Sequence, residues 1–341
     1  MRGFDYQGNI MVRALLVGAG RWGRVLVNSV QGISDKITFV AGLKTTTNDE
    51  EKAYAKEKGF DLLTCSLKEA ICRDDVDVAV LASPHSIHAE QIGVVIAAGK
   101  PIACEKPFTL DAQSARNVIK AANDAGVLLT VLHNRRFNTA YQEFQRIARE
   151  GELGKLHHME ANFSGESALR NVVESRPWRN DVTESPLGSM TNRGVHALDA
   201  MVGCCGPVEK VFASAYNSIG GLRDDTTACL LWFKNGMTGY LGTLNATTPH
   251  WQIKIFGVDG TAEMRGWREL IIHMQGEEPV INIFDKMDME RAELEAFADT
   301  VTGVASFPPR YPITTEEMIA VPAFLEAAIK SAKNGKVVAT C

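Results

Sequence analysis

The feature that most constrains this chain is a glycine-rich turn between a buried strand and a helix near its start. Four consecutive apolar residues, 14–17, indicate a strand buried on both faces of a parallel sheet. The turn reads Gly18-Ala19-Gly20-Arg21-Trp22-Gly23, and an apolar-periodic helix follows it through Val30. Such glycines permit a tight bend, the approach of a pyrophosphate to the backbone, and close packing of helix on strand. We therefore predict that Gly18, Gly20, Arg21, Trp22 and Gly23 bind a dinucleotide.

The second predicted strand, residues 37–43, ends at Lys44 and Thr45. At this point the dinucleotide fingerprint expects an acidic residue for the ribose hydroxyls, and Lys44 has the opposite charge. A cation suits the 2′-phosphate of NADP better than the free hydroxyl of NAD, although a strand-end lysine can also point into water. We expect Lys44 and Thr45 to contact the cofactor, with NADP slightly favoured over NAD.

Helices and strands alternate up to residue 133, which is typical of a doubly wound parallel sheet. Asn48 caps one helix, and Ser66 with Glu69 forms a capping box for the next. The pattern predicts a Rossmann domain of six strands over residues 1–133. Residues 1–10 read as a frayed extension, with Met11 as an alternative start.

Two strand ends carry polar residues to the edge of the sheet where open α/β proteins bind ligands. One strand is followed by Ser83-Pro84-His85 and then His88, although single histidines in such loops are more often hydrogen-bonding residues than catalysts. The other strand stops abruptly at Glu105-Lys106-Pro107, which delivers a lysine to its carboxyl end. The alternative for this last segment is a solvated Glu-Lys pair in a loop.

The second half, residues 134–341, changes character and predicts a further α/β domain. A helix at 139–150 precedes strand patterns at 157–164, 208–216, 226–233, 238–245 and 251–256, and Asn-Gly and Asp-Gly pairs mark hairpins between them. A large, mainly antiparallel open sheet is expected. Consecutive apolar residues at 228–233 suggest that helices cover one face and a second subunit the other. The closing helices, 288–301 and 314–333, are candidates for packing back on the first domain.

The segment from Gly188 to Asp199 is expected to open a helix. At helical spacing His196 and Asp199 are neighbours on one face. A histidine beside an aspartate can serve as a general base whose tautomer and charge the carboxylate holds. On an apolar helix, a buried core histidine is the alternative.

Composition excludes several classes of function. The net charge of −5 without a basic run argues against nucleic acid as a partner. No apolar stretch is long enough to span a bilayer and the N-terminus lacks the apolar core of a signal peptide, so we expect a cytoplasmic protein. Seven cysteines without a CxxC pair argue against a disulfide framework, a metal site or a zinc-dependent alcohol dehydrogenase, and most should be buried small hydrophobes.

With both halves described, the chain resembles the Gfo/Idh/MocA family of NAD(P)-dependent sugar and polyol oxidoreductases along nearly its whole length. The motifs that carry the resemblance are Gly18-x-Gly20-Arg21-Trp22-Gly23, Ser83-Pro84-His85 with His88, Ala98-Gly99-Lys100, Glu105-Lys106-Pro107, Asn134-Arg135-Arg136-Phe137, Trp178-Arg179, Gly194-x-His196-x-x-Asp199 and Ser331-x-x-Asn334-Gly335-Lys336-Val337. Together these motifs are specific to the family, but none identifies a substrate.

The resemblance implies an oxidoreductase that oxidises a secondary alcohol of a sugar, inositol or sugar acid, or reduces the corresponding ketone. Lys106 would polarise the substrate oxygen and His196 would exchange the proton, since an unperturbed histidine titrates near neutral pH. It further implies a cis peptide bond before Pro107 and homodimers or homotetramers formed through the second sheet. The implied residues are Ser83, Pro84, His85, His88, Glu105 and Lys106 for the cofactor, and Lys106, Arg136, Trp178, Arg179, Asn192 and His196 for the substrate.

One departure from the family pattern leaves alternatives open. Many members carry Asp two residues before the glycine of the G-x-H motif, where this chain has Asn192, and an amide cannot take a proton. The alternatives are a catalytically silent NAD(P)-binding sensor and an NAD-dependent glycosidase. Several arginines hint at a carboxylated or phosphorylated substrate, although exposed surface positions suit most of them: Arg136, Arg170, Arg176, Arg179 and Arg193.

Overall fold

A computed structural model describes residues 11–169, 181–220, 224–304 and 313–340. Two compact units divide the chain, and neither is one continuous stretch. The first unit takes the described residues of Met1–Thr109, Gln113–Asn134 and Asp288–Thr314, and the second takes those of Leu110–Ala112, Arg135–Met287 and Thr315–Cys341.

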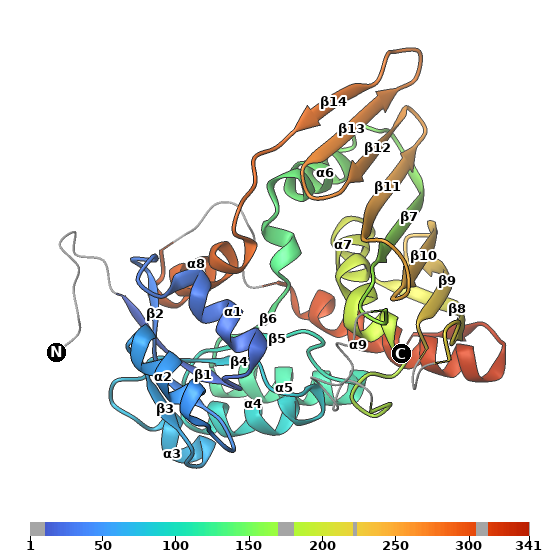
Figure 1. Ribbon diagram of the computed structural model, residues 1–341. Helices are drawn as coiled ribbons and strands as arrows, with labels where there is room; N and C mark the ends of the chain where they lie inside the picture. Colours follow the sequence, from blue (N-terminus) through green and yellow to red (C-terminus); the bar gives the residue numbers. More distant parts are fainter. Residues whose placement is uncertain (1–10, 170–180, 221–223, 305–312, 341) are drawn as a thin grey trace. The chain divides into compact units, whose positions relative to one another are not determined.

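The first unit is built on a six-stranded parallel sheet whose strand order is β3-β2-β1-β4-β5-β6 (Figure 1). This is the order of a doubly wound dinucleotide-binding domain, so the predicted Rossmann sheet is confirmed. Its central strands are apolar on consecutive residues because helices cover both faces. The strands are β1 (Val12–Val17), β2 (Ile37–Leu43), β3 (Asp61–Leu63), β4 (Val78–Leu81), β5 (Ile102–Glu105) and β6 (Leu129–Leu132).

Five helices connect these strands, and a sixth comes from far along the chain. The late helix α8 (Met289–Thr302) contacts α1, β1 and β2, and Leu294 and Phe297 on it join the buried core of this unit. Lys36 before β2 forms an ion pair with Asp299 on α8 at 2.8 Å. The connecting helices are α1 (Arg21–Val30), α2 (Asp49–Lys58), α3 (Leu67–Ile71), α4 (His88–Ala97) and α5 (Ala112–Ala125).

The second unit is built on a nine-stranded sheet of order β14-β13-β12-β11-β7-β10-β9-β8-β15. All pairs are antiparallel except β7 with β10, which confirms the predicted mainly antiparallel sheet. Four of the strands, β12 to β15, had no counterpart in the sequence prediction. The strands are β7 (Leu156–Ser164), β8 (Val208–Tyr216), β9 (Thr226–Phe233), β10 (Thr238–Leu244), β11 (His250–Gly257), β12 (Gly260–Arg265), β13 (Glu269–Met274), β14 (Val280–Ile283) and β15 (Val338–Ala339).

Helices α6 (Thr139–Glu150), α7 (Val195–Cys205) and α9 (Thr315–Asn334) pack on one face of this sheet and form a single core with it. Strand β9 shows the consequence: Cys229, Leu231 and Phe233 are buried on that face, while Leu230 on the other face is 50% exposed. Within the described part of one chain, helices therefore cover a single face of β9.

Among the cysteines in the described residues, Cys104, Cys205 and Cys229 are buried, Cys204 is half-buried, and Cys65 and Cys72 are exposed. None of the helices in the described ranges has the length and apolar character that crossing a membrane requires.

Candidate cofactor and catalytic site

The glycine turn at the end of β1 shows three different reasons for glycine. Gly18 has φ +97°, and a Cβ there would lie 2.7 Å from the carbonyl carbon of Ala82. A Cβ on Gly23 would lie 2.6 Å from the Gly18 carbonyl oxygen, so this residue permits the helix–strand contact. A Cβ on Gly20 would meet nothing within 4 Å. The protein's own packing therefore does not require glycine at position 20, which leaves room for a ligand against the backbone.

The same turn presents a helix N-terminus to that open space. Gly20 is the N-cap of α1 and provides no side-chain cap, so the first N–H groups of the helix have no acceptor from it. The backbone N–H of Gly18 donates to the Leu43 carbonyl at 3.0 Å, which places the end of β2 beside the turn. Arg21 is exposed on the first helical turn. These features fit the pyrophosphate of a dinucleotide.

Lys44, the predicted ligand of a 2′-phosphate, does not stand alone at the end of β2. Its ammonium group forms an ion pair with Glu51 of α2, and both side chains are partly buried. Thr45 is exposed beside it. The charge on which the NADP preference rested is therefore already balanced by a carboxylate.

The loop after β4 is tied to the turn after β5 by a histidine. His88 is fully buried, with Nδ1 3.1 Å from the Pro107 carbonyl oxygen and Nε2 3.1 Å from the Ser83 carbonyl oxygen. His85 is also buried, and its ring lies edge-on to His88 at a centroid distance of 6.0 Å. Pro84 precedes the short helical turn that contains His85. His88 thus acts as the hydrogen-bonding residue that the loop pattern indicated.

Strand β5 ends in a buried carboxylate next to Lys106. Glu105 is 5% exposed, accepts a hydrogen bond from Nε1 of Trp22 on α1, and accepts another from the Lys106 backbone N–H at 3.1 Å. Burial raises the pKa of Glu105 to about 7, although the charge of Lys106 and the Trp22 hydrogen bond lower it. The Lys106–Pro107 peptide bond is cis, as the resemblance implied. The glycine turn and the lysine segment are therefore joined within one unit.

Glu290 on α8 is a further charged residue in this region that sequence reasoning missed. Asn134 Nδ2 donates to its carboxylate at 2.8 Å, and its negative charge adds to the rise in the pKa of Glu105. No local pattern links residue 290 to residue 105, because α8 reaches the first unit only through the tertiary fold.

In the second unit, Asn192 and His196 lie on one continuous helical segment. A π-helical turn, Met190–Gly194, runs directly into α7, and such turns are frequent at functional sites. The Asn192 amide nitrogen donates to the Gly188 carbonyl at 2.9 Å, a bond for which an aspartate has no donor. Asn192 thus holds the backbone of this turn.

Asp199, one turn beyond the buried His196, has a different strong partner. Arg136 donates to both of its carboxylate oxygens, at 2.7 Å from Nη2 and 2.9 Å from Nε, and a third nitrogen of Arg136 lies 3.2 Å from Glu317 on α9. Arg136 is nearly fully buried. The geometry assigns Arg136 to holding α7 and α9 together, and it gives no support to the expected role in substrate binding.

Phe163 lies beside His196 and joins Trp251 and Trp267 in an aromatic cluster that sequence reasoning did not find. The ring of Phe163 lies 5.9 Å from that of His196, and Trp251 and Trp267 stack on each other at 4.5 Å and contact Phe163 edge-on. Arg193 lies over the Phe163 ring at 5.4 Å. Burial lowers the pKa of Arg193, although the negative charge of Glu166 raises it. Phe163 and Trp251 belong to the buried core of the second unit, and Arg135 lies over the Trp267 ring at 4.3 Å, so this cluster packs the region beside His196.

Comparison with known proteins identifies the two halves together. Residues 12–133 match the model of an oxidoreductase family with an NAD-binding Rossmann fold, and residues 141–263 match the model of the GFO/IDH/MocA C-terminal domain. The chain belongs to the Gfo/Idh/MocA oxidoreductase family.

Individual relatives of this Gfo/Idh/MocA protein are distant. It is 23% identical over 258 residues to the oxidoreductase YrbE of Bacillus subtilis, with 72% of each chain covered. It is 34% identical over 146 residues to inositol 2-dehydrogenase of Rhizobium meliloti, which covers 42% of this chain and 43% of that protein. The WlbA dehydrogenase of Bordetella pertussis, solved with NADH and UDP-GlcNAcA, superimposes with a TM-score of 0.82 at 22% identity over 96% of this chain and 97% of that one.

Some of the predicted site residues cannot be placed in this structure. Trp178, Arg179, Arg170 and Arg176 lie outside the described residues. In the described ranges no group of three or more His, Cys, Asp or Glu side chains is arranged to hold a metal ion. Lys106 belongs to the first unit and His196 to the second, so their joint action is a proposal developed below.

Proposed function

We propose that this protein is an NAD(P)-dependent dehydrogenase or reductase whose substrate is a sugar, an inositol or a sugar acid. The observation that carries the proposal is the hydrogen bond between Trp22 and Glu105, because it joins the glycine turn to the strand that delivers Lys106. The bound nicotinamide would accept or supply the hydride. Gly18, Gly20 and Gly23 shape the turn that receives the pyrophosphate, and Arg21, Trp22, Ser83, Pro84, His85, His88 and Glu105 line or support it.

Lys106 would donate a hydrogen bond to the substrate oxygen and stabilise the negative charge that develops there. Its backbone is fixed on one side by Glu105 and on the other by the Pro107 carbonyl contact to His88. These contacts fix the backbone position from which the Lys106 side chain extends.

His196 would accept the hydroxyl proton in oxidation and return it in reduction. An imidazole can do both near neutral pH, whereas an ammonium group remains charged. Asn192 would orient a substrate hydroxyl, and its place in the π-helical turn explains why an amide rather than a carboxylate stands there. The proposal requires the two units to present Lys106 and His196 to the same substrate.

The substrate class rests on the family to which both halves of the chain belong. Arg193, half-buried on the same helical segment as His196, offers a cation to an anionic group of the substrate. The similarity to inositol 2-dehydrogenase supports a polyol substrate. We further propose a homodimer or homotetramer formed through the uncovered face of the second sheet.

The test combines cofactor binding with turnover. Purified protein is titrated with NADH and NADPH by fluorescence quenching, and nicotinamide absorbance is then followed with inositols, aldoses and sugar acids. Binding with net reduction of NAD or NADP by one of these substrates supports the proposal. Binding with glycoside cleavage but no net reduction would replace it with the glycosidase, and binding without turnover on any substrate would replace it with the sensor.

A further inference from the structure

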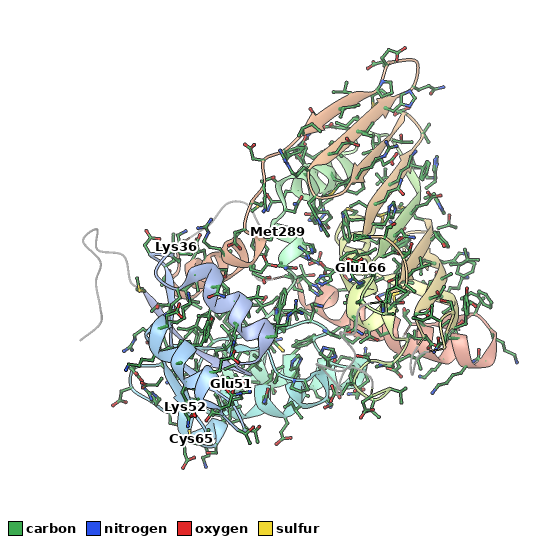
Figure 2. The ribbon with its side chains drawn as sticks, viewed as in Figure 1. Lys36, Glu51, Lys52, Cys65, Glu166 and Met289 are labelled. Atoms are coloured by element: carbon green, nitrogen blue, oxygen red, sulfur yellow. The ribbon has the colours of Figure 1, made fainter. Side chains whose placement is uncertain are left out.

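Two carboxylates on the first turn of α2 form ion pairs with basic residues near the glycine turn. Without these carboxylates, the basic residues would be available to bind a cofactor phosphate. Glu51 pairs with Lys44, which directly follows β2, and Glu50 pairs with Arg24 of α1 at 2.9 Å. Both basic residues come from elements that border the glycine turn, since α1 starts from it and the Leu43 carbonyl accepts from its backbone. Figure 2 labels Glu51 on this helix. Charge at this end of the sheet is therefore balanced by α2.

Glu51 is held rather than free to swing away. It is the third residue of a capping box, in which the Asn48 backbone N–H donates to its carboxylate at 3.2 Å and its own N–H donates to the Asn48 side chain at 2.9 Å. Burial raises the pKa of Glu51, but the Lys44 contact, the Asn48 N–H and the charge of Arg24 outweigh it and lower the pKa overall. The carboxylate is thus fixed and ionised at neutral pH.

In a dinucleotide-binding domain, a fixed carboxylate at this position affects which cofactor can bind. The end of the second strand is where such domains contact the ribose of the adenosine half, with an acid for the free hydroxyls and a cation for a 2′-phosphate. The sequence places Lys44 there, and the tertiary fold brings Glu51 to it from the next helix. We propose that Glu51 selects the cofactor: it accepts hydrogen bonds from the ribose hydroxyls of NAD and disfavours the 2′-phosphate of NADP, with Lys44 as its positioning partner.

The opposite assignment, Lys44 as a phosphate ligand, conflicts with this arrangement. A 2′-phosphate would have to take Lys44 from Glu51 and then lie beside a carboxylate that loses its partner. Arg24 pairs with the exposed Glu50 and lies over the Tyr54 ring at 4.8 Å. Glu51, Tyr54 and Arg24 also line one small cavity, together with Ala19 of the glycine turn. The inference rests on the proposed function only in requiring a nicotinamide dinucleotide.

The test is Glu51→Gln, which removes the charge while keeping a side chain that can complete a capping box. We expect the ratio of NADPH affinity to NADH affinity to rise by about tenfold or more, measured by fluorescence quenching without substrate. Glu69→Gln is the matched control. Glu69 is exposed and holds the same capping-box position on α3, with Ser66 as its partner, so its replacement should leave the ratio within about twofold.

Lys44→Met separates the two assignments. If Lys44 positions Glu51, its loss should weaken NADH binding and should not weaken NADPH binding selectively. A loss of NADPH affinity alone, or a ratio unchanged by Glu51→Gln, would overturn the inference while leaving the proposed function intact. A wild-type protein that binds neither dinucleotide would instead overturn the proposed function, so the two failures can be told apart.

Discussion

The indole nitrogen of Trp22 donates a hydrogen bond to the carboxylate of Glu105. Trp22 lies in the glycine turn that follows β1, at the start of α1. Glu105 ends β5, which is the second strand from β1 in the sheet order. The bond therefore couples the segment expected to hold the pyrophosphate to the residue next to Lys106. It also leaves a carboxylate buried at 5% exposure, which has a measurable consequence for stability.

Glu105→Gln should make the protein's stability less sensitive to pH. The folded-state pKa of Glu105, about 7, lies above its ordinary value of 4.5, so its protonated form contributes stability that is fully present below the ordinary value and is lost as the pH rises through about 7. Glutamine is neutral throughout. The wild type should therefore lose stability relative to Glu105→Gln between about pH 5 and about pH 8. We expect the difference between their free energies of unfolding to change by on the order of 3 kcal/mol at most.

Urea denaturation at the two pH values measures this change. Glu69→Gln is the control, because Glu69 is exposed and its serine contacts lower its pKa, so it stays ionised across that interval. Wild-type and Glu105→Gln proteins with the same dependence of stability on pH would show that the buried carboxylate does not titrate in this range.

Local sequence patterns were sufficient for most of the fold. The apolar runs and glycine turn of the first half determined β1, α1 and β2, and the helix at 139–150 and the strand at 208–216 have the bounds that were predicted. Strands β12 to β15 were missed. β12 has no run of apolar residues, β13 has only the short run 270–272, and β14 is exposed at Val280 and Ile283. These three become strands by pairing with β11 and with each other.

The candidate site was predictable only where a residue's role follows from its immediate neighbours. Gly18, Gly23 and Lys106 were found because a strand end or a turn specifies them. The ion pairs of Lys44 with Glu51 and of Arg136 with Asp199 were not found, because each joins residues on separate elements. In each pair a carboxylate balances a cation that had been assigned to a ligand. Glu290 reaches Asn134 from 156 positions along the chain, a separation that no periodicity encodes.

Breaking the buried pair between Arg136 and Asp199 should be costly. Arg136→Met leaves the Asp199 carboxylate buried at 1% exposure without its bidentate donor, and Asp199→Leu leaves the guanidinium without its main partner. Each single change should lower the free energy of unfolding by about 3–5 kcal/mol. The double variant should lose clearly less than the sum, because neither unpaired charge remains.

Arg146→Met provides the control for this cycle. Arg146 also contacts carboxylates, including Glu143 at 2.7 Å and Glu150 at 2.6 Å, but it is 39% exposed. Its loss should cost about 1 kcal/mol or less. Additive losses in the Arg136 and Asp199 double variant, measured by chemical denaturation, would contradict the coupling.

Replacing Lys106 or His196 should remove turnover without removing the cofactor. Lys106→Met deletes the donor to the substrate oxygen and His196→Asn deletes the proton acceptor, so kcat should fall by about 10²–10⁴ in each case. NADH affinity, measured by fluorescence quenching, should stay close to that of the wild type. Lys120→Met, at an exposed position on α5, should change neither quantity. Full turnover by Lys106→Met would remove this residue from the mechanism.

Leu230→Glu should dissociate the proposed oligomer. Leu230 is 50% exposed on the face of β9 away from α7 and α9, and its cross-strand neighbours are Tyr240 at 39% exposure and the half-buried Phe212. If a second copy covers this face, a buried unpaired carboxylate there would cost more than the contact can offset. Light scattering at micromolar concentration should show a multimer for the wild type and for Ile33→Glu, whose exposed isoleucine follows α1 in the other unit, but a monomer for Leu230→Glu. A monomeric wild type, or a Leu230→Glu variant with unchanged mass, would exclude this face as the interface.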